Sequence, residues 1–148
     1  MKECLDYDRL CEIPTKIRKH AERKLKNDPK ACALSKRDEL LMTWLTILPW
    51  RQKYLRQLTI GSRKNGANLF TDRIAPSSAT ARPGWVEEAL DHNPRQHFWH
   101  FCFRDNETKT GHAILALLPR QLVPLLEEYL TYHRPLLVTG HDPGNQVA

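Results

Sequence analysis

Apolar residues recur at helical spacing in the middle of the chain. Between Ser35 and Leu48, five apolar residues fall along one side of a helix, and Ser35 with Asp38 resembles a capping box at its start. These five are Leu40, Leu41, Trp44, Leu45 and Leu48. The pattern predicts a helix from Ser35 to Leu48, which Pro49 then stops.

The same spacing predicts two further helices. Pro14 suits the first turn of a helix that runs to about Asn27, and Asp28 with Pro29 marks its end. Near the other end of the chain, residues 121–133 form an amphipathic pattern. Its apolar side consists of Leu122, Leu125, Leu126, Tyr129 and Leu130.

The segment between these helices favours strands and loops. His97–Phe103 and Ala113–Leu118 are strand-like, and the polar letters RDNETKTG between them predict a hairpin turn. Residues 61–84 are rich in Gly, Pro and Ser and predict at most one short strand, within an excursion that extends to about residue 96. Trp85–Leu90 favours one or two helical turns. The expected fold class is mainly α with a small antiparallel β-sheet (α+β), in one domain over residues 1–148.

The positive charge of the chain is concentrated in its first half. The chain carries a formal net charge of +6, and residues 1–64 hold 16 Lys and Arg against 8 Asp and Glu. Five basic residues fall at i, i+3, i+7, i+10 and i+14, a spacing that predicts one helical face: Lys16, Lys19, Arg23, Lys26 and Lys30. Such a basic stripe indicates a polyanionic partner such as double-stranded DNA, although an ordinary solvated face has the same pattern.

Other classes of protein fit the sequence poorly. The longest apolar run, residues 40–50, is too short to span a membrane, and the first residues lack the regions of a signal peptide, so a cytoplasmic protein is expected. Four scattered cysteines predict buried free thiols: Cys4, Cys11, Cys32 and Cys102. No metal or other cofactor is expected, since in a strand His97 faces away from His100 and Cys102.

The stretch LPWRQKYLRQLTI places an arginine on an apolar helical face. In a short helix, Arg51 shares its face with Leu55 and Leu58, at i+4 and i+7. A permanent charge in that position fits poorly with a simple apolar core. Lys109, in the ETKTG turn, is the other residue whose place suggests chemistry.

The order of these features resembles the tyrosine recombinase (phage integrase) family. The resemblance covers residues 35–137 and is carried by LLMTWLTILPWRQKYLRQLTIG and ETKTGHAILALLPRQLVPLLEEYLTYHRPLL. The first segment is similar to the one with that family's first active-site arginine, and the second to its lysine hairpin and following helix. The resemblance implies the catalytic-domain fold of the DNA breaking-rejoining enzymes.

The resemblance also implies roles for two residues. Arg51 would hold the non-bridging oxygens of the scissile DNA phosphate, and Lys109 would donate a proton to the leaving 5′ oxygen. The sequence departs from the family at Tyr54, where an acidic residue is common, and at Pro49, where glycine is usual.

The family's remaining catalytic residues have no counterpart in family order. The chain reaches Ala148 before an HxxR box or a tyrosine nucleophile follows the hairpin, and HNPR at residues 92–95 precedes it. We therefore expect a partial catalytic domain that binds DNA and is catalytically incomplete, with self-association or contact with a C-terminal half. Two alternatives stay open: a small basic DNA-binding or regulatory protein without recombinase chemistry, and a decaying reading frame.

Overall fold

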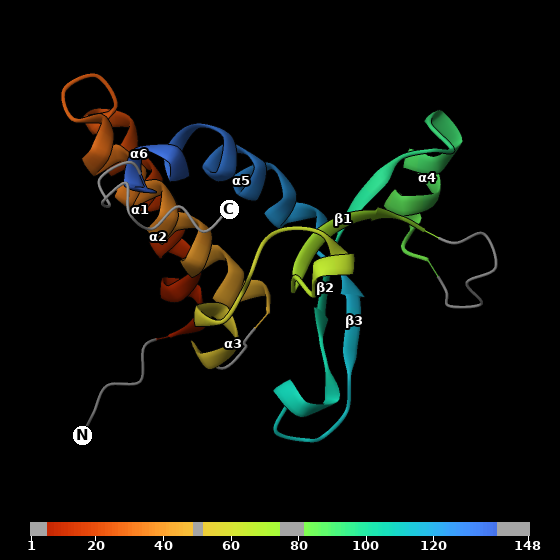
Figure 1. Cartoon of the computed structure of the whole chain (residues 1–148). Helices are drawn as coiled ribbons and strands as arrows, with labels where there is room; N and C mark the ends of the chain where they lie inside the picture. Colours follow the sequence, from red (N-terminus) through yellow and green to blue (C-terminus); the bar gives the residue numbers. More distant parts are fainter. Residues whose placement is uncertain (1–5, 49–51, 75–81, 139–148) are drawn as a thin grey trace. The chain divides into compact units, whose positions relative to one another are not determined.

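The computed structural model describes residues 6–48, 52–74 and 82–138 (Figure 1). It is mainly helical with one three-stranded antiparallel sheet, so the expected α+β class is confirmed. The chain divides into two compact units, residues 1–50 with 121–148 and residues 51–120. The single domain expected over residues 1–148 stays a prediction.

The first unit is built from helices that pack around α2. In Figure 1, α1 and α2 form a helical hairpin, and α2 also packs against the π-helical turn η4 and against α6. Its core contains Ala21, Cys32, Ala33, Leu40, Trp44 and Leu126. The bounds are α1 Tyr7–Lys24, α2 Pro29–Ile47, α5 Val123–Glu128, η4 Tyr129–His133 and α6 Arg134–Val138.

Two predicted helix starts were wrong. Helix α1 begins at Tyr7, and Pro14 lies inside it with its ring buried. Packing of the ring offsets the cost of the missing backbone hydrogen bond, since proline has no N–H to donate. Helix α2 begins at Pro29 because Asp28 caps it, with Asp28 Oδ1 accepting from Ala31 N at 3.0 Å. Ser35 therefore lies within α2 and caps nothing. The last helical segment also continues past His133, as far as Val138.

A buried carboxylate links the helices of the first unit. Glu39 of α2 is fully buried, and its Oε1 accepts from Arg18 Nε of α1 at 2.6 Å. Lys36 Nζ lies 3.3 Å from Glu39 Oε2 and 3.3 Å from Glu128 Oε1 of α5. Glu128 Oε1 in turn lies 3.4 Å from Nε2 of the buried His133. The network therefore joins α1, α2, α5 and η4.

The pKa values of the two cations reflect this network. The hydrogen bond to Glu39 and its charge raise the pKa of Arg18. Burial by itself lowers the pKa of Lys36, but Glu39 and Glu128 outweigh that effect and leave the pKa raised. Both side chains are thus held in their charged forms beside the carboxylates.

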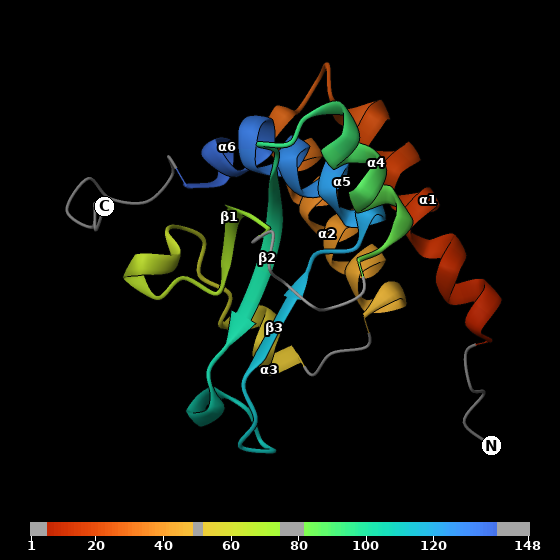
Figure 2. The same ribbon diagram turned by 90° about the vertical axis from the view of Figure 1, so that its right-hand side faces the viewer.

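The second unit contains the sheet, in the order β1-β2-β3. Strand β2 has the predicted bounds, β3 lies within the predicted segment, and β1 is the one short strand expected in the Gly, Pro and Ser rich stretch. Figure 2 shows β2 and β3 running side by side into their hairpin. The bounds are α3 Gln52–Arg56, η1 Arg63–Asn65, β1 Leu69–Arg73, α4 Gly84–His92, β2 His97–Phe103, η2 Asp105–Glu107 and β3 Ile114–Leu117; η3, Arg120–Leu122, follows.

Aromatic side chains fill both faces of β2. Phe101 and Phe103 are buried on one face, and Phe98 is buried on the other. Trp85 of α4 packs edge-on against Phe98, with ring centroids 5.8 Å apart. Phe70 of β1 pairs with His100 in the sheet register and stacks on its ring at 5.5 Å.

Replacement of Glu39 tests the buried network. We expect Glu39→Gln to lower the free energy of unfolding by about 2 kcal/mol, because Arg18 and Lys36 lose the buried carboxylate between them and Lys36 keeps only Glu128. The control is Glu12→Gln, whose pair with Lys16 is well exposed and should contribute less than about 0.5 kcal/mol. Urea unfolding followed by circular dichroism measures both. Equal effects of the two substitutions would contradict the network's structural role.

Candidate functional site

Lys109 occupies the exposed turn between β2 and β3. Thr108 Oγ1 donates to His112 O at 2.8 Å, which closes the turn across Lys109. Gly111 has φ +70°, a conformation that L side chains rarely adopt, and its N–H donates to Thr108 O at 3.4 Å. The turn chemistry therefore places Lys109 where its ammonium group is open to solvent.

Tyr54 of α3 contacts the lysine hairpin at two places. Its Oη accepts from Lys109 N at 3.3 Å, and its ring lies 5.1 Å, centroid to centroid, from the ring of Phe103 at the end of β2. Helix α3 is thereby attached to the hairpin. In the sequence, Tyr54 stands out only as a departure from the family pattern, and no local signal links it to a residue 55 positions away.

Arg51 lies outside the described residues, directly before α3. The expectation that Arg51 and Lys109 border one surface therefore stays a prediction. Tyr54, which contacts Lys109, is the residue three positions after Arg51. It shows that the helix following Arg51 and the hairpin belong to the same local structure.

A buried amide supports the base of the hairpin. Asn68 is 5% exposed, and its Nδ2 donates to Cys102 O at 2.9 Å and to Glu107 Oε2 at 3.5 Å. Its Oδ1 accepts from Thr59 Oγ1 at 3.0 Å. Glu107 Oε2 also accepts from Arg104 N at 2.7 Å, so the first residues after β2 are fixed before the turn begins.

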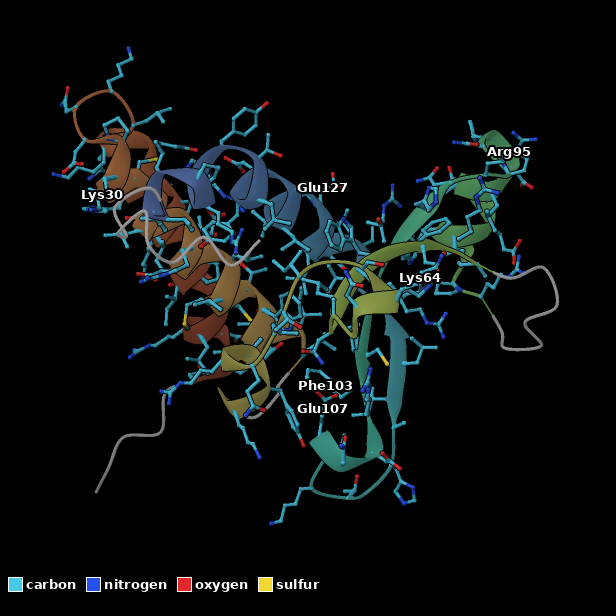
Figure 3. All side chains as sticks on the ribbon, viewed as in Figure 1. Lys30, Lys64, Arg95, Phe103, Glu107 and Glu127 are labelled. Carbon is cyan, nitrogen blue, oxygen red and sulfur yellow. The ribbon has the colours of Figure 1, made fainter. Side chains whose placement is uncertain are left out.

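The basic residues of the predicted stripe do not all share one helix. Lys16, Lys19 and Arg23 are exposed on α1, at i, i+3 and i+7. Lys26 follows the end of α1, and Lys30 is the second residue of α2, near the α1–α2 turn in Figure 3. The single five-residue face was wrong, because Asp28 and Pro29 end one helix and start another.

The histidines and cysteines form no metal centre within the described ranges. His100 Nδ1 lies 2.8 Å from Phe98 O, and burial lowers the pKa of this imidazole. Cys32 is a buried free thiol, as expected, and burial raises its pKa. Cys11 is exposed and Cys102 is half-buried, so the expectation of buried thiols was wrong for Cys11 and is met only in part by Cys102. Cys4 is outside the described residues.

Comparisons with known proteins give no relative: no protein family, curated protein or solved structure matches this chain. None of the helices in the described segments is both long enough and apolar enough to cross a bilayer. The candidate site is therefore defined by its own geometry, namely the Lys109 hairpin with Tyr54 and Asn68, and separately the basic face of α1.

Removal of the Tyr54 hydroxyl tests its hold on the hairpin. We expect Tyr54→Phe to keep the ring packing on Phe103 and to speed hydrogen exchange of the Lys109 amide about three- to tenfold, since one hydrogen bond is lost. The control is Tyr132→Phe in the exposed part of η4. Exchange is read residue by residue by NMR. An unchanged Lys109 amide in Tyr54→Phe would show that the contact does not position the turn.

Proposed function

We propose that this chain is part of a site-specific DNA recombinase of the tyrosine recombinase type and that it binds double-stranded DNA. The observation that carries the proposal is the lysine hairpin. Lys109 lies in an exposed turn between two antiparallel strands, and Tyr54 ties that turn to the helix that follows Arg51. This is the arrangement expected if Arg51 and Lys109 act on one phosphate group.

The proposed chemistry divides between the two residues. The planar guanidinium group of Arg51 would bind two non-bridging oxygens of the phosphate and stabilise the charge that develops there. The Lys109 ammonium group would donate a proton to the departing 5′ oxygen. A side chain on an exposed turn can approach DNA without displacing the sheet.

Attack on the phosphate is not assigned to this chain. Tyr129 and Tyr132 lie in η4 of the first unit, and the Tyr54 hydroxyl accepts from Lys109 N. None of these follows the hairpin in the position that the family's nucleophile takes. Under the proposal these 148 residues contribute phosphate binding and proton donation, and no covalent step.

The basic face of α1 favours the second candidate, a small basic DNA-binding protein without recombinase chemistry. Lys16, Lys19 and Arg23 are exposed along one face of α1, and Lys16 is partly neutralised by Glu12 at 3.2 Å. Such residues would contact backbone phosphates without reading the base sequence. The two candidates share this binding and differ in whether Arg51 and Lys109 form one site.

Salt dependence tests DNA binding. We expect weak, sequence-tolerant binding of a fluorescent duplex, with an affinity that falls as salt rises. Replacing Lys16, Lys19 or Arg23 by Gln should each reduce the slope of log affinity against log salt concentration by roughly 1, because each phosphate contact releases counterions. Lys109→Ala should change the affinity little. Arg134→Gln, on the exposed start of α6, is the charge-matched control. Absence of binding in low salt, or an affinity independent of salt, would exclude the proposed function.

A further inference from the structure

A small cavity opens beside η1 in the second unit. Its volume is about 140 Å³, and its walls include Arg63, Gly66, Phe70, Arg104 and Glu107. This is more space than a single water molecule needs. Lys109 does not line it, so the cavity is separate from the proposed catalytic turn.

The guanidinium group of Arg104 lies against the backbone of Gly66. A Cβ atom added at Gly66 would lie 2.9 Å from Arg104 Nη2, and Gly66 has φ +76°. Glycine at this position thus provides both the left-handed turn and the space for the guanidinium group. Among the carboxylates that the structure describes, none forms an ion pair with Arg104.

Arg63 supplies a second guanidinium group to the same cavity. Its Cζ lies 5.8 Å from the centroid of the Phe70 ring, which faces the cavity from β1. Its nearest carboxylate contact is long, 3.7 Å from Nη1 to Asp72 Oδ2, and its side chain is 60% exposed. Asp72 therefore neutralises Arg63 only weakly.

The other polar groups of the cavity are already engaged. Glu107 Oε2 accepts from Arg104 N and Asn68 Nδ2, so this carboxylate supports the backbone. Gly66 N donates to Arg63 O at 3.1 Å, and Ala67 N donates to Ser62 O at 3.3 Å. The donors that remain for a ligand are the two guanidinium groups. Glu107 is the carboxylate in the cavity wall, and Asp72 lies outside the wall, 3.7 Å from Arg63.

We propose that this cavity binds one phosphate group of a nucleic-acid backbone, held between Arg63 and Arg104. Planar guanidinium groups match the oxygens of a phosphate. The hydrogen bonds of Asn68 hold the backbone from which the Arg63 and Arg104 side chains extend. The identity of the ligand as a DNA phosphate rests on the proposed function. The affinity of the cavity for a phosphate group does not depend on the proposed function, and a separate experiment measures it.

Inorganic phosphate is the first probe. In an NMR titration at low salt, we expect the amides of Gly66 and Ala67 and the side-chain Nε signals of Arg63 and Arg104 to shift together. Arg104→Gln should abolish these shifts, and Gly66→Ala should weaken binding at least fivefold although it removes no charge. Gly111→Ala is the matched control, because Gly111 has a similar φ of +70° with nothing within 4 Å of an added Cβ. Phosphate shifts that are absent, or equal in Gly66→Ala and Gly111→Ala, would overturn the site.

Duplex DNA is the second probe. Arg104→Gln should lower the log–log salt slope of duplex binding by about 1. The control is Arg95→Gln, which lies near α4 at the opposite end of β2 from η2 (Figure 3) and should leave the slope unchanged. A phosphate titration that succeeds while Arg104→Gln leaves the slope intact would contradict a DNA phosphate as the ligand. If wild-type protein binds no duplex, the proposed function fails, while the NMR titration still decides the phosphate site.

Discussion

The side chain of Asn68 connects the segments on which both proposed sites in the second unit depend. An asparagine amide has two donor hydrogens and an acceptor oxygen, and the hydrogen bonds to Thr59, Cys102 and Glu107 use both ends of the group. Because Asn68 is buried, each of these hydrogen bonds that failed to form would leave a polar group unsatisfied, at a desolvation cost of about 1–3 kcal/mol. The amide therefore favours one arrangement of the loop before β1 and the end of β2. The lysine hairpin and the cavity lined by Arg63 and Arg104 both depend on that arrangement.

Glu39 has a comparable place in the first unit. A buried carboxylate is costly unless cations and hydrogen bonds compensate it, and Arg18 and Lys36 come from two different helices to do so. The same Lys36 also contacts Glu128, which extends the constraint to the helices after the sheet. The first unit thus joins the beginning and the end of the chain, while the intervening residues 51–120 form the unit that contains the hairpin.

Local patterns in the sequence were sufficient for part of this structure. The aromatic run HFWHFCF predicted β2 with its bounds, and the polar turn between two apolar strands predicted the Lys109 hairpin, because strand alternation and turn chemistry are local properties. Pro14 misled the prediction of α1, since its effect depends on packing. Asp28 was read only as the end of a helix, although it also caps the next one. Tyr54 and the Arg104–Gly66 contact join residues far apart in sequence, so no local pattern could have revealed them.

The central claim is that Arg51 and Lys109 face one surface and can serve one phosphate, and a paramagnetic label measures this most directly. A nitroxide attached to Arg51→Cys, with Cys4, Cys11 and Cys102 replaced by serine, broadens NMR signals of nearby residues. The account predicts strong broadening of the amides from Lys109 to Gly111 and little at Arg95, which lies at the other end of β2. Broadening around Arg95 with sharp hairpin signals would contradict the recombinase hypothesis and favour the basic DNA-binding protein.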